Sequence, residues 1–186
     1  EILNEANSYT EEVRRSIKEK YGFKKLYSEG LSIRTPLNVN YQIQAIVSLR
    51  NGIEAYDRRH GWRGPITNKI KNSNWEKVVK DIKIDPTLNW NKAEILNISE
   101  DGINFKTLKG YKGNIPIKNL KWAISKNKNI FNRFSVGDII FVKKNNNNWD
   151  LKQYPKVNGG IVVIDPFTGN VKALVGGFNF KSSEFN

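Results

Sequence analysis

Two features of this chain are of a type that could support catalysis: one serine–lysine spacing and one histidine. Ser125 and Lys128 match the Ser-x-x-Lys spacing, which places a lysine beside a serine nucleophile on one helical turn. The elements that should oppose such a pair are missing, because the sequence contains no Lys-Thr-Gly run. Its only Ser-x-Asn, Ser125 to Asn127, overlaps the same four residues. We therefore interpret this match as a coincidence and expect no stand-alone serine acyl-enzyme.

The second candidate is His60, the only histidine, which stands between Arg59 and Gly61. No cluster of acidic residues surrounds it in the sequence, so we interpret it as a loop or helix-end residue. The adjacent acids Glu11-Glu12 and Glu100-Asp101 are interpreted as solvated charges. Cysteine is absent, which excludes disulfides and cysteine-based zinc sites. We expect no catalytic, cofactor-binding or metal-binding residue in this chain.

The composition is that of a basic protein with enough apolar residues to form a core. Hydrophobic residues make up 38% of the 186 residues and the formal net charge is +13. Residues 68–158 contain 17 lysines and one arginine against eight acidic residues, so they carry most of the excess. This charge favours a polyanionic partner, such as nucleic acid, anionic lipid or an acidic cell-wall polymer. A solvated surface rich in lysine and asparagine explains it equally well.

The chain shows no sign of a membrane span or a signal peptide. No apolar run approaches the roughly 20 residues needed to cross a bilayer. The first residue is Glu1, and the sequence contains no methionine. We therefore expect the chain to be a piece of a longer protein, whose own signal or anchor this sequence does not reveal.

The first third of the chain predicts two helices and a strand. Ser8 to Glu11 has capping-box spacing and opens a helix that Gly22 should end. Residues 30–35 alternate like a strand. Asn38 can cap a longer helix. The apolar stripe predicted for that helix is Ile46, Leu49, Ile53 and Tyr56. A loop at 60–65 and a short helix over 75–82 follow, and Asp85-Pro86 ends that helix.

From about residue 89 the hydrophobic period changes to two and predicts five strands. They cover residues 90–98, 103–107, 114–117, 139–142 and 149–153, and a helical link at 120–125 separates the third from the fourth. Ile95-Leu96 breaks the alternation as a β-bulge does. Pro116 indicates an edge or a strand end. Five short strands with this link predict an OB-like β-barrel.

A last hairpin is predicted from strands at 159–164 and 171–175 around a turn at 165–169. Because two strands alone are marginal in water, we expect a sheet that continues beyond Asn186. The fold class is mostly β with flanking helices (α+β). The predicted divisions are a linker region at 1–67, an OB-like β-barrel at 68–157 and the start of another domain at 158–186.

Several runs of residues resemble class A penicillin-binding proteins of the 1A group. They are GLSIRT at 30–35, AYDRRHGWRGP at 55–65, the barrel segments 113–117, 120–123, 136–138 and 149–155, and the hairpin segments 160–166, 173–178 and 183–186. The resemblance covers nearly the whole chain in the expected order. The helix opening at Leu37-Asn38-Val39 departs from the usual Thr-Leu-Asp-Pro but keeps a capping residue. By resemblance, residues 158–186 begin the transpeptidase domain.

The resemblance implies a bifunctional parent that polymerises lipid II glycan strands and cross-links their peptides. Such a parent is anchored in the bacterial inner membrane, faces the periplasm and is acylated by β-lactams. Its glycosyltransferase glutamates and divalent metal would lie before Glu1, and its transpeptidase serine would lie after Asn186. The chain itself would be a non-catalytic spacer between the parent's catalytic domains. It would also offer a docking face to a periplasmic regulator or to peptidoglycan.

The alternative is a nucleic-acid-binding OB-fold protein. Such proteins stack bases on exposed aromatic side chains of the second and third strands. Phe105 alternates with Asn104 and Lys106 and should face the core, which leaves Tyr111 in a turn. One tyrosine is a poor stacking platform, so we expect no specific nucleic-acid binding and only weak, salt-sensitive attraction.

Overall fold

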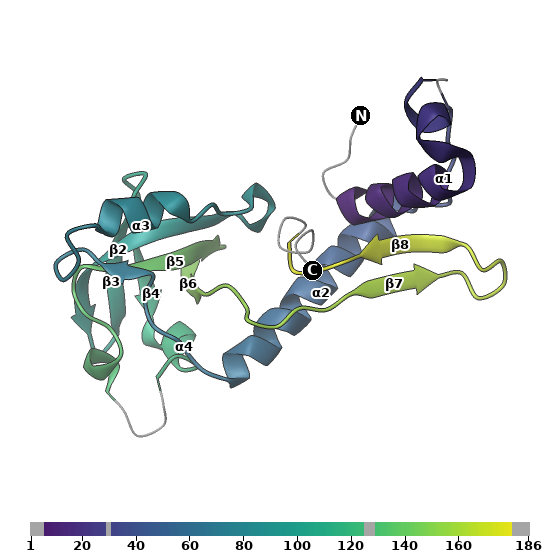
Figure 1. Ribbon diagram of the computed structural model, residues 1–186. Coiled ribbons are helices and arrows are strands. Elements are labelled where there is room, and N and C mark those ends of the chain that lie inside the picture. Colours follow the sequence, from purple (N-terminus) through teal and green to yellow (C-terminus); the bar gives the residue numbers. More distant parts are fainter. Residues whose placement is uncertain (1–5, 29–30, 125–128, 180–186) are drawn as a thin grey trace. The chain divides into compact units, whose positions relative to one another are not determined.

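The computed structural model describes residues 6–28, 31–124 and 129–179 (Figure 1). The chain divides into two compact units, one made of Glu1–Ala55 with Pro155–Asn186 and the other of Tyr56–Tyr154. The divisions predicted from the sequence, 1–67, 68–157 and 158–186, stay a prediction. The mostly β, α+β fold class is confirmed, since helices flank two antiparallel sheets.

An antiparallel sheet forms the centre of the Tyr56–Tyr154 unit. Its strands follow the order β1-β5-β2-β3-β4, and β6 pairs with β5. They are β1 (Thr67–Asn68), β2 (Trp90–Ser99), β3 (Gly102–Thr107), β4 (Lys112–Pro116), β5 (Asp138–Asn145) and β6 (Asn148–Lys152). The five predicted strands are thus present, and β1 is an addition too short to show a sequence pattern. Among the described residues no ladder joins β4 to β6, so the OB-like sheet does not close into a barrel.

Alternation along the strands builds the core of this unit. On β3, Ile103, Phe105 and Thr107 are buried while Asn104 and Lys106 are exposed. The predicted bulge is present, because the register between β2 and β3 shifts between Ile95 and Asn97. The shift leaves Ile95 fully buried and turns Leu96 outward. The cluster at the centre is Trp62, Ala93, Ile95, Ile103, Phe105, Ile115, Leu120, Ala123, Ile130, Phe134, Ile140, Val142 and Leu151.

Short helical segments connect these strands. Helix α3 (Trp75–Asp81) is present as predicted, and Asp85 opens the 3-10 helix η2 (Pro86–Leu88) by accepting a hydrogen bond from Thr87 N–H at 2.8 Å. The link between β4 and β5 contains helix α4 (Ile117–Leu120) and the 3-10 helix η3 (Ile130–Asn132). Helix α4 begins earlier than predicted, directly after Pro116. The Ser125 to Lys128 motif lies outside the described residues.

Helix α1 (Asn7–Ser28) and the segment after it differ from the predicted pattern. Gly22 interrupts α1 with φ 81° and ψ 165°, as its position predicts, but helical residues resume after it. Ser8 is not the cap, because it lies inside the helix and its Oγ accepts a hydrogen bond from Gly176 N–H at 3.3 Å. The predicted strand at 30–35 is wrong over its described residues. Residues 31–35 form no ladder, since the hairpin sheet of this unit contains only two strands.

Helix α2 (Val39–Arg59) begins at the predicted cap. The Asn38 side-chain oxygen accepts a hydrogen bond from Tyr41 N–H at 3.1 Å. Leu49 and Ile53 are buried as predicted, but Tyr56 is 44% exposed. The buried face instead continues back through Ala45 and Gln42, which have the helical spacing from Leu49.

Gln42 is buried because its side chain completes the backbone of the hairpin. The hairpin joins β7 (Ile161–Ile164) to β8 (Val171–Val175). The Gln42 amide donates to Leu174 C=O and accepts from Leu174 N–H, both at 2.9 Å. A buried polar side chain is tolerated when both of its hydrogen-bonding groups are used in this way.

The hairpin has one covered and one open face. Ala173 and Val175 on β8 are buried, whereas Val162 and Ile164 on β7 are more than half exposed. In the turn, the Asp165 carboxylate accepts the N–H groups of Phe167 and Thr168. These hydrogen bonds favour the charged form and lower the pKa of Asp165 below its ordinary value of 3.8. The segment 183–186 of the resemblance lies outside the described residues.

Candidate functional site

Asp57, near the end of helix α2, is the centre of a buried polar cluster. Its side chain is 4% exposed and meets Arg63 in a two-pronged ion pair. Arg63 Nη1 donates to Oδ1 at 2.8 Å, and Nη2 donates to Oδ2 at 3.0 Å. The planar guanidinium matches the two carboxylate oxygens, which is the strong geometry for such a pair. Asp57 is therefore held as a structural carboxylate.

Gln153, just after strand β6, completes this cluster. Its side-chain amide donates to Asp57 Oδ2 at 2.8 Å and to Gly61 C=O at 3.1 Å. Arg63 Nη2 also donates to Tyr154 C=O at 2.5 Å. We call Asp57, Arg63 and Gln153 the Asp57 clamp. The clamp connects residues 57–63 to a segment more than 90 positions later in the chain.

Trp62 inserts into the core beside the clamp. It is 6% exposed and packs edge-on against Trp122, with ring centroids 5.8 Å apart. Arg133 Nη2 donates to Trp62 C=O at 2.5 Å. The Arg58 guanidinium lies 5.1 Å from the centroid of the Trp122 ring, which is cation–π range. The run Asp57 to Arg63 is thus built into the OB-like unit through its buried carboxylate and Trp62.

His60 has a structural place in the same turn. Its Nδ1 lies 3.1 Å from Tyr56 C=O, and its ring centroid lies 4.7 Å from that of Tyr56. Within the described part of the chain, no three histidine, cysteine or acidic side chains are grouped to hold a metal ion. These contacts with Tyr56 give His60 a structural role at the end of helix α2.

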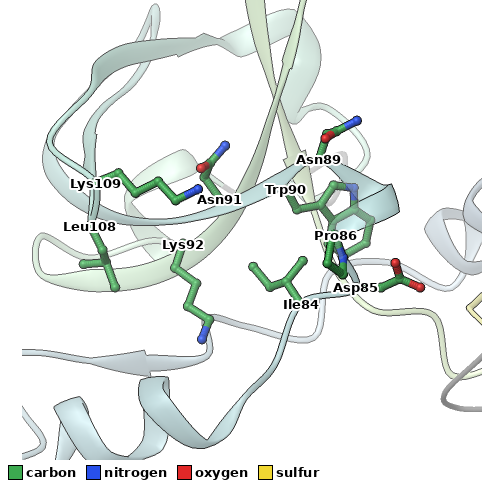
Figure 2. A pocket seen from close by; sticks show the side chains of 9 residues that line it. All are labelled: Ile84, Asp85, Pro86, Asn89, Trp90, Asn91, Lys92, Leu108 and Lys109. Carbon is green, nitrogen blue, oxygen red and sulfur yellow. The ribbon is translucent and has the colours of Figure 1, made fainter. Parts of the chain in front are cut away.

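A pocket opens between the η2 segment and the start of β2 (Figure 2). Its volume is about 580 Å³, within the range of small-ligand sites. It is lined by Ile84, Asp85, Pro86, Asn89, Trp90, Asn91, Lys92, Leu108 and Lys109. Leu108 and Lys109 come from the turn between β3 and β4. Sequence reasoning did not identify this pocket, because its residues come from three separate segments.

The two lysines of the pocket differ in their surroundings. The Lys92 ammonium donates to the carbonyl oxygens of Val79 and Ile82, and its burial lowers the pKa of its amine. Lys109 is exposed at the turn, and no ion pair involves it among the described residues. Lys92 therefore has a structural role, whereas Lys109 is available to solvent.

Polar side chains cover the outward face of β3 and β4 next to this turn. Lys106 lies directly opposite Lys112, and Asn104 lies opposite Asn114. The Asn114 amide donates to Asn104 Oδ1 at 2.9 Å. Phe105 is 1% exposed, which confirms the prediction that it faces the core, and Tyr111 is 65% exposed in the turn. This face offers two cations, two amides and one aromatic ring.

Comparison with known proteins identifies the family of the unit just described. Residues 62–157 match the family model of the penicillin-binding protein OB-like domain. The chain is 37% identical over 95% of its length to penicillin-binding protein 1A of Rickettsia conorii, and 30% identical over its whole length to that of Escherichia coli. Among the described residues, no helix is long and apolar enough to cross a membrane.

The fold has a solved counterpart in the same group. The crystal structure of penicillin-binding protein 1A from Haemophilus influenzae matches 97% of this chain with a TM-score of 0.72 and 25% identity. The chain covers 27% of that structure, 22% of the Rickettsia conorii protein and 23% of the Escherichia coli protein. The chain therefore belongs to the penicillin-binding proteins, as a segment of the 1A type that carries their OB-like domain.

Proposed function

We propose that this chain is the non-catalytic linker and OB-like segment of a bifunctional peptidoglycan synthase with glycosyltransferase and transpeptidase activities. The observation that carries the proposal is the structural use of the run Asp57 to Arg63. Its buried carboxylate is satisfied by Arg63 and Gln153, and Trp62 anchors it in the core. Its residues of catalytic type thus have structural partners, and the family match covers the same unit.

The proposed parent is anchored in the inner membrane outside this segment and faces the periplasm, where it builds the cell wall. Within it, the segment acts as a spacer between the catalytic domains and as a docking face for a periplasmic regulator or for peptidoglycan. The exposed polar face of β3 and β4 supports the docking role, because Lys106 and Lys112 lie directly opposite each other and an anionic partner would neutralise their like charges.

The basic charge of the OB-like unit suits a nucleic acid, but its aromatic side chains do not. Phe105 is buried, and Tyr111 is the one exposed aromatic side chain of the β3–β4 hairpin. Base stacking on several rings in succession is what holds a single strand on such a surface. We therefore expect oligonucleotide binding to be weak and to disappear at moderate salt.

Covalent labelling with a fluorescent penicillin tests the non-catalytic assignment. The full-length parent should be labelled, whereas the isolated 186-residue chain should stay unlabelled at the same concentration and time. Labelling of the isolated chain that is lost in Ser125→Ala would overturn the proposal, because it would identify Ser125 as an acylated nucleophile.

A further inference from the structure

The pocket and the outward face of the β3–β4 hairpin share one structural element, the turn at 108–111. Leu108 N–H donates to Lys92 C=O at 2.9 Å, which joins the turn to the pocket side of β2. Thr107 closes the turn, since its N–H donates to Tyr111 C=O at 2.7 Å and its Oγ1 accepts from Tyr111 N–H at 3.0 Å. The pocket and the cation pair Lys106–Lys112 are thereby held next to each other.

The charges of this region are unbalanced. Glu94 on β2 lies directly opposite Lys106, and its carboxylate forms its ion pair with Lys69 at 3.1 Å. Asp85 accepts two hydrogen bonds from Thr87, at 2.8 and 2.7 Å. Within the part of the chain that the structure describes, Lys106, Lys109 and Lys112 form no ion pair, although Glu94 faces Lys106 across the β2–β3 ladder. Like charges directly opposite on antiparallel strands repel, so an anion bound between them would be stabilised.

We propose that this region binds carboxylate-bearing peptidoglycan, with Lys106, Lys109 and Lys112 as the cations that recognise its carboxylates. The proposal deepens the docking role above and rests on the proposed function. The strands concerned, β3 and β4, are the second and third of the five strands β2 to β6. The corresponding face of OB folds binds oligosaccharides as well as oligonucleotides.

The remaining groups favour a glycan over a nucleic acid. Asn104 and Asn114 on the face, with Asn89 and Asn91 at the pocket, offer amide donors and acceptors that suit hydroxyl and acetamido groups. Leu108 and the neighbouring apolar pocket residues offer a surface for a sugar ring. A single strand of nucleic acid needs successive aromatic rings instead, and only Tyr111 is exposed here.

Binding of soluble peptidoglycan fragments, released by lysozyme, tests the ligand. Isothermal titration calorimetry with the isolated chain at low ionic strength should show binding, and fragments with amidated carboxylates should bind at least tenfold more weakly. An oligo(dT) 12-mer serves as the polyanion control. Equal binding of amidated and native fragments would refute the carboxylate assignment. Tighter, salt-resistant binding of oligo(dT) would replace the glycan with a nucleic acid.

Two pairs of variants test the site. Replacing Lys106, Lys109 and Lys112 together by Gln should weaken binding at least tenfold. The same charge removed elsewhere, at the exposed residues Lys24, Lys118 and Lys121, should change it less than twofold. Leu108→Glu should abolish binding, whereas Leu96→Glu, at a leucine of similar exposure, should not.

Equal losses in the two triple variants would reduce the effect to net charge and contradict the site. The lysine variants and the leucine variants test the site independently, and circular dichroism checks that each variant is folded. Penicillin labelling tests the non-catalytic assignment, and calorimetry tests the peptidoglycan site. A failure to bind peptidoglycan would therefore refute the site and leave the non-catalytic assignment intact.

Discussion

Asp57 shows how a residue of catalytic type can be committed entirely to structure. Its carboxylate is buried, and a guanidinium and an amide reach it from different parts of the chain. A charge in such a place is costly unless its hydrogen bonds are satisfied, and here they are. The run around it could be identified from the sequence as a distinctive motif, but its partner Gln153 is 96 positions away, so the clamp itself could not be predicted.

Removing the Asp57 carboxylate should therefore destabilise the OB-like unit strongly. We expect Asp57→Ala to lower the free energy of unfolding by about 3 kcal/mol, because Arg63 would keep its charge without its main partner. Urea denaturation followed by tryptophan fluorescence measures this change. Glu76→Ala, at an exposed position of α3, should cost about 0.5 kcal/mol or less. Equal effects of the two substitutions would contradict the structural role of the clamp.

At the scale of elements, the strands could be predicted because each carries its own signal. Alternation along 103–107 and the Asp101-Gly102 turn fix that strand locally, and the bulge at Leu96 interrupts the pattern where the register shifts. The strand expected at 30–35 failed for the opposite reason. Alternation states which residues could share a face, but a strand exists only where a neighbour supplies its ladder, and residues 31–35 have none.

The buried face of α2 shows the same limit. The apolar residues Ile46 and Tyr56 suggested one side of the helix, whereas the covered side runs through Gln42, Ala45, Leu49 and Ile53. A glutamine on a buried face has no sequence signal, because its burial depends on the hydrogen bonds it exchanges with Leu174 of β8.

Gly102 permits the tight hairpin between β2 and β3, and a substitution there separates two physical effects. Its φ is 148°, and an added Cβ would lie 2.1 Å from Ile115 C=O on β4. Gly110 also has a positive φ, 97°, but its Cβ would meet nothing within 4 Å. We expect Gly102→Ala to cost about 2 kcal/mol more than Gly110→Ala, because only the former adds a backbone clash to the conformational strain.

Thermal unfolding of the two glycine variants measures this difference, with the amide signals of β4 as a local probe. The amide signals of β4 should change position and lose intensity in Gly102→Ala but not in Gly110→Ala. If the two alanine variants unfold at the same temperature, the β3–β4 pairing at Gly102 and Pro116 is looser than the structure describes.

At the scale of the whole molecule, the sequence locates the OB-like strands well, whereas the division at 68 stays a prediction. A division at 68 follows the change of pattern after the loop at 60–65. The core nevertheless includes Trp62, and the compact unit begins at Tyr56. Periodicity could not reveal this, since a single tryptophan in a loop has no period, and its burial depends on Trp122 and Phe134.

Two fragments of the chain distinguish these boundaries. A fragment of residues 56–154 retains Asp57, Trp62 and Gln153, so we expect it to unfold cooperatively in urea with dispersed amide signals in its NMR spectrum. A fragment of residues 68–157 keeps strands β2 to β6 but lacks Trp62 and the first residue of β1. Loss of a buried tryptophan costs about 3–5 kcal/mol, a large part of the stability of a domain of this size. The shorter start should therefore yield a fragment that is largely unfolded or binds a hydrophobic dye. Equal stability of the two fragments would show that the Asp57 clamp and Trp62 are dispensable, and would place the beginning of the folded unit at residue 68.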